Sequence, residues 1–181
     1  MAAKDQQDFC KGVKLLYPSL FQGDVLDLGS LDINGNNRYL FDGNNYKYLG
    51  VDLGEGPNVD VIGKAHELKF IDNFFDVIIS TEMLEHDPYW DSSVKNALRM
   101  LKPGGLMILT MGGVGRKEHG TTKSIPEDSP FTTKMEEEWQ TYYKNLTMED
   151  ILSVLLRNEF KVYSLTMNNE HCDLYFYGIK K

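Results

Sequence analysis

Hydrophobic and polar residues follow one another along this chain in blocks with two different periods. Apolar residues at steps of three and four predict amphipathic helices over 5–17, 89–101 and 148–158. Short apolar runs between polar or glycine-rich stretches are typical of strands, and they occur at residues 24–28, 46–53, 59–62, 73–81, 106–111, 160–167 and 171–178. Because helical and strand segments alternate, the pattern predicts an α/β fold around a seven-stranded, mostly parallel sheet with helices on both faces. The last two strands, joined by the polar segment 167–170, predict a terminal antiparallel pair.

Local signals mark the ends of two of these helices. Thr147 and Asp150 have the spacing of a capping box, which predicts that a helix begins at Met148. Pro103 cannot continue the helix over 89–101, and the two glycines after it supply the turn into the next strand. The motif around Pro103 therefore has a structural explanation and needs no chemical one.

Composition narrows the class of protein. The 181 residues, 41% of them hydrophobic, suffice for one domain, 1–181, with a single core. A net charge of −8 with scattered Lys and Arg would repel a polyphosphate backbone, so nucleic acid is disfavoured as a partner. Cys10 and Cys172 lack the spacing of a disulfide framework or a zinc site, which favours a reducing cytoplasm and predicts no metal. No apolar run has the length of a membrane span or a signal peptide, so we expect no membrane partner.

The stretch VLDLGSLDING, residues 25–35, carries the first chemical signal. It is typical of a buried strand that runs into a glycine turn, where the backbone is able to approach a ligand closely. Leu31 stands where a dinucleotide-binding loop has its second glycine. A tight connection that binds nothing is the alternative interpretation.

Asp52 carries the second signal, at the end of the strand over 46–53. A carboxylate at this place accepts hydrogen bonds from both hydroxyls of an unmodified ribose. A solvated loop aspartate is the alternative. The glycine turn and Asp52 together favour a nucleoside cofactor more strongly than either does alone.

Four segments of the chain resemble one known family. In order and spacing, the chain resembles the class I S-adenosylmethionine-dependent methyltransferases, small bacterial and phage-type members that are type 11-like, in VLDLGSLDINGN, YLGVDLGEGPNVDVI, FDVIISTEMLEHDPYW and LRMLKPGGLMILT. The similarity covers about residues 24–111. It implies a Rossmann-like domain with a cofactor-binding core at about 20–112 and a substrate loop or lid at about 112–146.

The resemblance also implies which residues contact S-adenosyl-L-methionine. Listed from the methionine part through the ribose and adenine to the floor of the site, they are Asp27, Gly29 and Ser30; Asp52; Leu53, Ala65 and His66; and Thr81, Glu82 and Met83. Lys64 stands where many relatives have an acidic residue, so the hydrogen bond that such a residue makes to the adenine amino group is not expected here.

Leu31 fits this cofactor better than a dinucleotide. A pyrophosphate laid against the loop would collide with a Cβ at the second glycine position. S-adenosylmethionine has no phosphate, so its amino-acid tail is compatible with a loop in which Leu31 turns aside. The side chain of Leu31 therefore argues against a nicotinamide or flavin enzyme.

His86 and His119 are the candidate general bases. His86 would face the substrate side, with a helix-start histidine bonded to a neighbouring carboxylate as the alternative. His119 lies in the segment 112–131, whose polar, glycine-rich composition is typical of a lid or binding loop, and it is a candidate base or substrate contact. A base is needed only for a hydroxyl or a protonated amine, because positioning of the acceptor supplies most of the catalysis.

The acceptor is less determined than the cofactor. The strand over 73–81 ends in Ser80, Thr81 and Glu82 rather than in the proline-containing motif of DNA amino-methyltransferases, so we expect a small-molecule or saccharide acceptor. Two other classes stay open: an inactive S-adenosylmethionine-binding module that acts as a partner or regulatory subunit, and a nucleotide-sugar or NAD-binding Rossmann enzyme. The sequence does not determine the oligomeric state.

Overall fold

A seven-stranded sheet forms the centre of the computed structural model, which describes residues 4–41, 43, 45–155 and 157–181. The strand order is β3-β2-β1-β4-β5-β7-β6, in which β7 is antiparallel to both neighbours and the other pairs are parallel. The strands are β1 (Gly23–Leu28), β2 (Tyr46–Asp52), β3 (Val61–Ile62), β4 (Phe75–Thr81), β5 (Leu101–Gly112), β6 (Phe160–Asn168) and β7 (Asp173–Lys180). The helices are α1 (Lys4–Leu16), α2 (Trp90–Met100), α3 (Glu137–Gln140) and α4 (Met148–Val154). The predicted sheet, with its antiparallel terminal pair, is confirmed.

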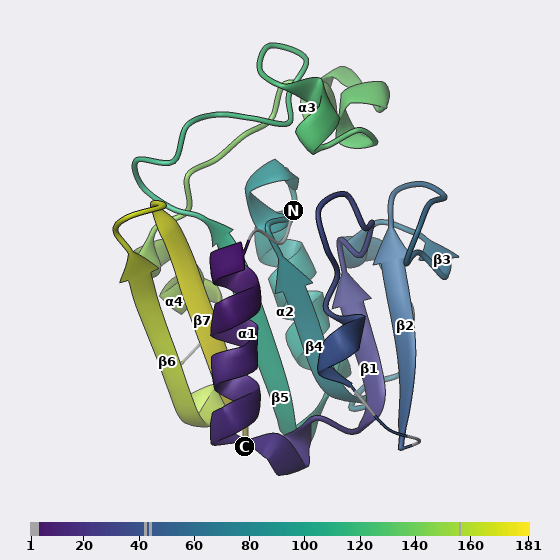
Figure 1. Ribbon diagram of the computed structural model, residues 1–181, viewed down its shortest axis with the longest axis vertical. Coiled ribbons are helices and arrows are strands. Elements are labelled where there is room, and N and C mark those ends of the chain that lie inside the picture. Colours follow the sequence, from purple (N-terminus) through teal and green to yellow (C-terminus); the bar gives the residue numbers. More distant parts are fainter. Residues whose placement is uncertain (1–3, 42, 44, 156) are drawn as a thin grey trace.

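Helices lie on both faces of this sheet (Figure 1). Helix α1 packs on one face, where Cys10 and Val13 join a cluster with residues of β1 and β4. Helices α2 and α4 pack on the other face, where Val94 and Ile151 join the larger cluster. The described parts of the connections between β1, β2, β3 and β4 contain short 3-10 turns, such as Arg38–Leu40 and Ala65–Glu67.

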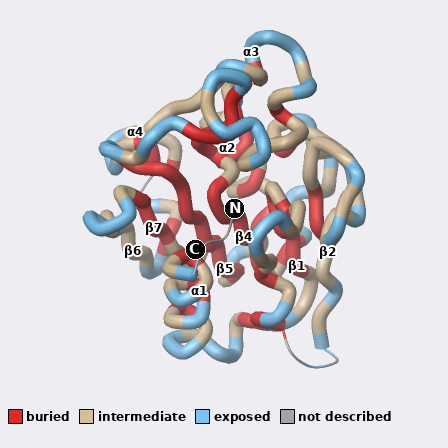
Figure 2. The backbone as a smooth tube through the Cα atoms, turned by 45° about the horizontal axis from the view of Figure 1, so that its top comes forward, coloured by how far each residue is buried: buried red, intermediate tan, exposed pale blue. Residues whose placement is uncertain are grey.

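Strand β4 shows why the sheet is buried on both sides. Val77, Ile78 and Ile79 are all inaccessible to solvent. Successive side chains of a strand point to opposite faces, so Val77 and Ile79 pack with the α1 cluster and Ile78 packs with the α2 and α4 cluster. Figure 2 shows the same concentration of buried backbone in the central strands.

Three element boundaries differ from the sequence-based expectation. Strand β5 begins at Leu101, because Leu101 pairs with Phe75 before the Pro-Gly-Gly stretch bulges out of register. The final turn occupies residues 169–172, two positions later than expected. Helix α4 begins at Met148 as predicted but ends at Val154, and Leu156 of the predicted span lies outside the described residues.

The segment 113–146, which we call the lid segment, rises above the carboxyl ends of the parallel strands (Figure 1). An isolated bridge between Gly113 and Leu146 joins its two ends, and α3 lies within it. Its 3-10 turns and α3 give it more local structure than its glycine-rich sequence predicts.

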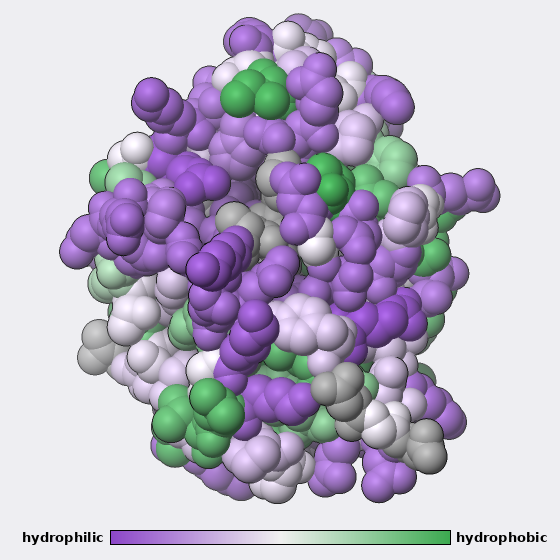
Figure 3. All heavy atoms as spheres, in the orientation of Figure 1, coloured by the Kyte–Doolittle hydropathy of each residue, from purple (hydrophilic) through white to green (hydrophobic). Residues whose placement is uncertain are grey.

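The helices and one face of the surface bear on whether the chain spans a membrane. Within the described parts of the chain, no helix has the length and apolar character needed to cross a membrane. The face seen in Figure 3 is mostly hydrophilic and carries small, separate hydrophobic patches.

Candidate functional site

A cavity lies at the carboxyl ends of β1, β2 and β4, beneath the lid segment. Its volume is about 670 Å³, including the solvent at its mouth. We call it the main cavity. Its walls are formed by Leu28, Gly29, Leu31, Ile33, Val51, Asp52, Leu53, Gly63, Ala65, Glu82, Met83, His86, Asp87, Asp128, Ser129, Pro130, Phe131, Thr132 and Trp139.

Gly29 makes the turn at the end of β1 that opens onto the main cavity. Its φ of 76° lies in the left-handed region, and a Cβ built on it would be 2.6 Å from the Met83 side chain. The amides of Gly29 and Ser30 donate to the carbonyl oxygen of Val51 at 2.9 and 3.1 Å. Glycine is therefore required here by both backbone conformation and space.

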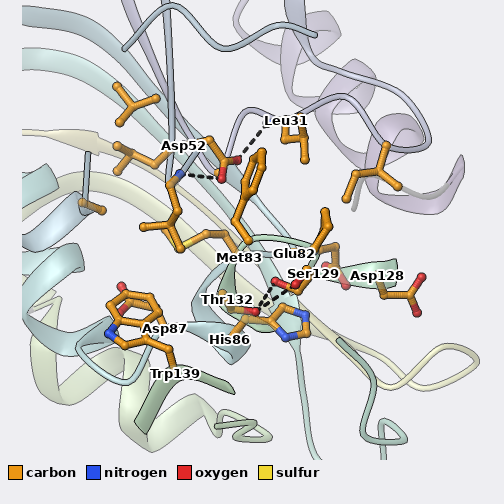
Figure 4. A pocket seen from close by; sticks show the side chains of 18 of the residues that line it. Leu31, Asp52, Glu82, Met83, His86, Asp87, Asp128, Ser129, Thr132 and Trp139 are labelled. Carbon is orange, nitrogen blue, oxygen red and sulfur yellow. Dashed lines mark hydrogen bonds between the residues drawn. The ribbon is translucent and has the colours of Figure 1, made fainter. Parts of the chain in front are cut away.

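Asp52 lies on the wall at the end of β2. Its two carboxylate oxygens accept hydrogen bonds from the amides of Leu31 (2.9 Å) and Leu53 (2.7 Å), as Figure 4 shows. Burial raises the pKa of Asp52, and these two donors oppose the rise. A carboxylate has about four acceptor positions, so Asp52 is held in place with capacity for further donors from the main cavity.

Leu31 turns its side chain toward the neighbouring loop while it borders the main cavity. Its Cδ1 atom lies 2.4 Å from the position that a Cβ on Gly56 would occupy. The absence of a side chain at Gly56 thus provides the space into which Leu31 packs.

Glu82 follows β4 with a backbone conformation that is unusual for a residue other than glycine. Its φ is 54°, and its amide donates to the carbonyl oxygen of Thr110 at 2.9 Å. Burial raises the pKa of Glu82 well above its usual value, and the charge of Glu85 raises it further. Glu82 borders the main cavity and also a second cavity, whose walls are Glu82, Arg116, Lys117, Glu118, His119, Ile125 and Asp128.

The lid segment covers the main cavity with residues that sequence reasoning did not assign. The Phe131 ring packs over Gly54, where a Cβ would lie 2.6 Å from it. The Thr132 hydroxyl donates to Ser129 Oγ at 2.8 Å, and Figure 4 shows both side chains at the cavity. Trp139 is buried and stacks on His66 with ring centroids 6.2 Å apart. The sequence signal for this cover is the group of aromatic residues Trp139, Tyr142 and Tyr143, which is compatible with lid packing or with stacking on an acceptor.

Seven of the predicted site residues line the main cavity: Gly29, Asp52, Leu53, Ala65, Glu82, Met83 and His86. Five others are not among its lining residues: Asp27, Ser30, His66, Thr81 and His119. Strand alternation explains Asp27 and Thr81, which share the α1 face of the sheet with Val25 and Val77. His119 borders the second cavity instead.

Three of the predicted residues that do not line the main cavity, Asp27, Thr81 and His66, contact other side chains instead. Asp27 accepts a hydrogen bond from the Tyr48 hydroxyl, and burial raises its pKa to about 7. Thr81 Oγ1 accepts from Asn37 Nδ2 at 3.1 Å. The His66 ring lies 4.4 Å from that of Tyr89.

The two candidate bases lie next to each other. The rings of His86 and His119 are 4.9 Å apart and nearly perpendicular. Tyr143 lies 5.4 Å from the first ring and 5.1 Å from the second. Burial lowers the pKa of His86 well below its usual value, and the neighbouring His119 lowers it further. Residues 33 positions apart in the sequence (119 minus 86) thus form one group.

Comparison with known proteins agrees with this geometry. Residues 26–109 match the model of a family described as a methyltransferase domain. Phosphoethanolamine N-methyltransferase 2 of Caenorhabditis elegans is 28% identical over an alignment of 109 residues that covers 52% of this chain and 25% of that protein. The aligned part thus spans a quarter of the length of this curated relative.

Solved structures show the same fold at low sequence identity. Phosphoethanolamine N-methyltransferase 2 of Haemonchus contortus, in complex with phosphomonomethylethanolamine and S-adenosylhomocysteine, has a TM-score of 0.63 at 18% identity, covering 96% of this chain and 52% of that chain. The 1,6-didemethyltoxoflavin-N1-methyltransferase of Burkholderia thailandensis, with bound 1,6-didemethyltoxoflavin and S-adenosylhomocysteine, has a TM-score of 0.61 at 16% identity, covering 99% and 84%.

The strand order and the position of the main cavity define a class I methyltransferase fold. The match of residues 26–109 to a methyltransferase-domain family supports the predicted resemblance to the S-adenosylmethionine-dependent methyltransferases in this part of the chain. The predicted fold is confirmed.

Proposed function

We propose that this protein transfers a methyl group from S-adenosylmethionine to a small-molecule or saccharide acceptor. The observation that carries the proposal is the carboxylate of Asp52, fixed by two backbone amides on the wall of a cavity that opens between the Gly29 turn and Met83. Such a carboxylate suits the two hydroxyls of a ribose. The walls offer no cluster of cations for a pyrophosphate among their described residues.

The cofactor would lie along the main cavity, and its ribose, adenine and methionine parts would each contact different residues of the cavity walls. The ribose would meet Asp52, and the adenine would pack between Leu53 and Met83, near Ala65. The methionine part would pass the Gly29 turn toward Glu82, where a buried acidic side chain complements a sulfonium or ammonium cation. Asp27, behind the turn, would act on the methionine part only through the backbone that it supports.

The reaction is an in-line displacement at the methyl carbon. A lone pair of an acceptor oxygen or nitrogen forms the new bond to this carbon as the carbon–sulfur bond breaks, and the sulfur keeps the electron pair to give S-adenosylhomocysteine. The proton of the acceptor leaves to a base or to water. His86 and His119 stay predictions for that base. Alignment of donor and acceptor supplies about 7–11 kcal/mol of the barrier reduction in well-oriented systems, and the covering lid segment would exclude water.

The second cavity is the proposed acceptor site, because Glu82 and Asp128 border both cavities. Polar and charged residues dominate its walls, which favours a hydrophilic acceptor. Two solved neighbours contain small-molecule substrates, and this supports the same class of acceptor here.

Two measurements on the full chain test the proposal. Thermal unfolding is followed with S-adenosylmethionine, S-adenosylhomocysteine or NAD, since a ligand stabilises the folded state by about 2.7 kcal/mol at a concentration of 100 times its Kd. Formation of S-adenosylhomocysteine is then measured with a panel of phosphorylated amines, small hydroxy compounds and simple saccharides. We expect stabilisation by the first two ligands and acceptor-dependent turnover.

Other outcomes point to other functions. Stabilisation by S-adenosylmethionine without turnover on the whole panel would favour the binding module, a regulatory partner without chemistry. Stabilisation by NAD alone would overturn the cofactor assignment.

A further inference from the structure

Three potential metal ligands meet where the main and second cavities adjoin. Glu85 and His86 belong to the 3-10 turn Leu84–His86 that follows β4, and His119 comes from the lid segment. One ligand atom from each lies within 4.8 Å of the others. All three residues are buried, with exposed fractions of 0%, 5% and 8%. The fold therefore brings one carboxylate and two imidazoles together away from bulk water.

Several polar atoms of this group lack hydrogen-bond partners. Within the described part of the chain, neither carboxylate oxygen of Glu85 is hydrogen-bonded, and His86 Nδ1 is not either. The approach of His86 Nε2 to Glu85 Oε1, at 4.0 Å, is too long for a hydrogen bond. An ionised carboxylate buried without partners is costly. Its oxygens and the imidazole nitrogen are the kind of orphaned atoms that a bound cation would satisfy.

His119 is oriented as metal-binding histidines usually are. Its Nδ1 lies 3.0 Å from the carbonyl oxygen of Lys117. As a donor in this hydrogen bond, Nδ1 carries the proton, and Nε2 keeps a free lone pair. A backbone carbonyl that fixes the ring in this way is a common outer partner of a metal-ligating imidazole.

The charges around the group also favour a cation. Glu82, three residues before Glu85, adds a second buried acidic side chain. Arg116 also borders this region, but its guanidinium pairs with Asp173 at 3.4 Å. Among the described residues, no ion pair is found between Arg116 and Glu85, so a divalent ion would add positive charge next to these two buried acidic residues.

We propose that Glu85, His86 and His119 bind a divalent transition-metal ion of the first row, such as Mn²⁺, Co²⁺ or Zn²⁺. Such ions bind imidazole nitrogen and carboxylate oxygen at about 2.0–2.2 Å, so their ligands lie within about 4.4 Å of one another and the cluster needs only a small contraction. Imidazole ligands disfavour Mg²⁺ and Ca²⁺. Two histidines and one carboxylate leave coordination positions open for a further ligand.

The location suggests what that ligand is. His86 borders the main cavity and His119 borders the second cavity, so the open positions lie between the proposed donor and acceptor. An ion there would hold an acceptor oxygen and lower its pKa. This role rests on the proposed methyl transfer, whereas metal binding itself does not. As ligands, the two histidines would not take the proton of the acceptor.

The test is titration of the chelator-treated, tag-free full chain with CoCl₂, followed by visible absorption and calorimetry without cofactor or acceptor. We expect one equivalent of Co²⁺ with ligand-field bands, and competition by ZnCl₂ but not by MgCl₂. His119→Ala and the nearly isosteric Glu85→Gln should each weaken binding by more than about tenfold, since even outer-shell changes cost about 10- to 100-fold. Circular dichroism verifies that each variant is folded.

His171→Ala is the matched control. His171 is half exposed and pairs with Asp5 at 2.6 Å, so its loss should leave Co²⁺ affinity unchanged. Absence of the bands in the wild-type protein would overturn the proposal, and so would equal affinity in wild type and the folded Glu85→Gln variant. Metal binding without methyl transfer would leave this proposal standing and count only against the proposed function.

Discussion

At the scale of single residues, Asp52 is the side chain on which the cofactor assignment depends most. Asp52→Asn removes the negative charge and one acceptor oxygen while it keeps the size of the side chain. Hydrogen bonds to charged groups contribute about 1.5–3 kcal/mol, so we expect about 10- to 100-fold weaker binding of S-adenosylmethionine. Isothermal titration calorimetry measures this change.

Glu55→Gln is the control for Asp52→Asn. It removes the same charge from an exposed residue of the same loop that does not line the main cavity. Its affinity should match the wild-type value. Equal losses in both variants would mean that general electrostatics, rather than a contact with the ribose, explains the effect.

Asp27 predicts a pH dependence of stability. Burial raises its pKa from 3.8 to about 7, so the folded state holds this proton where the unfolded chain has released it. The contribution of the protonated Asp27 to the free energy of unfolding is therefore fully present below pH 3.8, falls as the pH rises toward 7, and is absent above that. Between pH 3.8 and 7, the free energy of unfolding of the Asp27→Asn variant, measured by urea denaturation, should therefore fall by up to about 4 kcal/mol less than that of the wild type. Asp24→Asn, on the same strand but less buried, should decline as the wild type does.

The sequence identified site residues that directly follow a recognisable strand. It did not identify those whose position depends on packing between distant parts of the chain. Gly29 and Asp52 follow apolar strands directly, so their place at the carboxyl edge of the sheet was predictable. Ser30, by contrast, packs behind the turn, where its Oγ would lie 2.7 Å from a Cβ on Gly50. Which way a loop side chain turns depends on its packing neighbours, and no local spacing encodes them.

At the scale of elements, the start of α4 is the clearest local signal in the chain. Thr147 Oγ1 accepts from the Asp150 amide at 3.0 Å, and Asp150 Oδ2 accepts from the Thr147 amide at 2.9 Å. The predicted capping box is confirmed. Thr147→Ala should lower the free energy of unfolding by about 1 kcal/mol, because it leaves helix amides without an acceptor.

Urea denaturation monitored by circular dichroism measures the loss of this cap. Ser153→Ala, a change at an exposed residue of the same helix whose hydroxyl donates to the Asp150 carbonyl oxygen, is the matched control. It should stay within about 0.5 kcal/mol of the wild type. A Thr147→Ala variant as stable as this control would mean that packing of Ile151 and Leu155 alone fixes the helix.

The sequence predicts the end of an element well where a strong stop signal is present. The predicted end is wrong where pairing with a neighbouring strand determines it. The Pro-Gly-Gly stretch ends α2, yet pairing of Leu101 with Phe75 draws the residues before it into β5. Likewise, the pairing of Asn168 with Asp173 places the final turn at residues 169–172, two positions later than its polar turn signal. Strand ends are set by the neighbouring strand, which a linear pattern does not contain.

At the scale of the whole molecule, the lid segment determines the candidate chemistry. It carries His119 to His86 and places Phe131 and Trp139 over the main cavity. Its sequence predicted a polar loop but not its path, because the path follows from contacts between residues far apart in the chain. The absence of a predicted metal site has the same cause, since the proposed ligands come from two separate segments.

The backbone of Glu82 has a consequence for the evolution of this protein. A residue other than glycine in a left-handed conformation costs on the order of 1–3 kcal/mol, a large part of a total stability of about 5–15 kcal/mol. Selection for robustness alone would place glycine there. A lineage that retains an acidic side chain at this position accepts a less robust fold in exchange for its chemistry, so thermostable descendants are expected to gain their stability elsewhere in the chain.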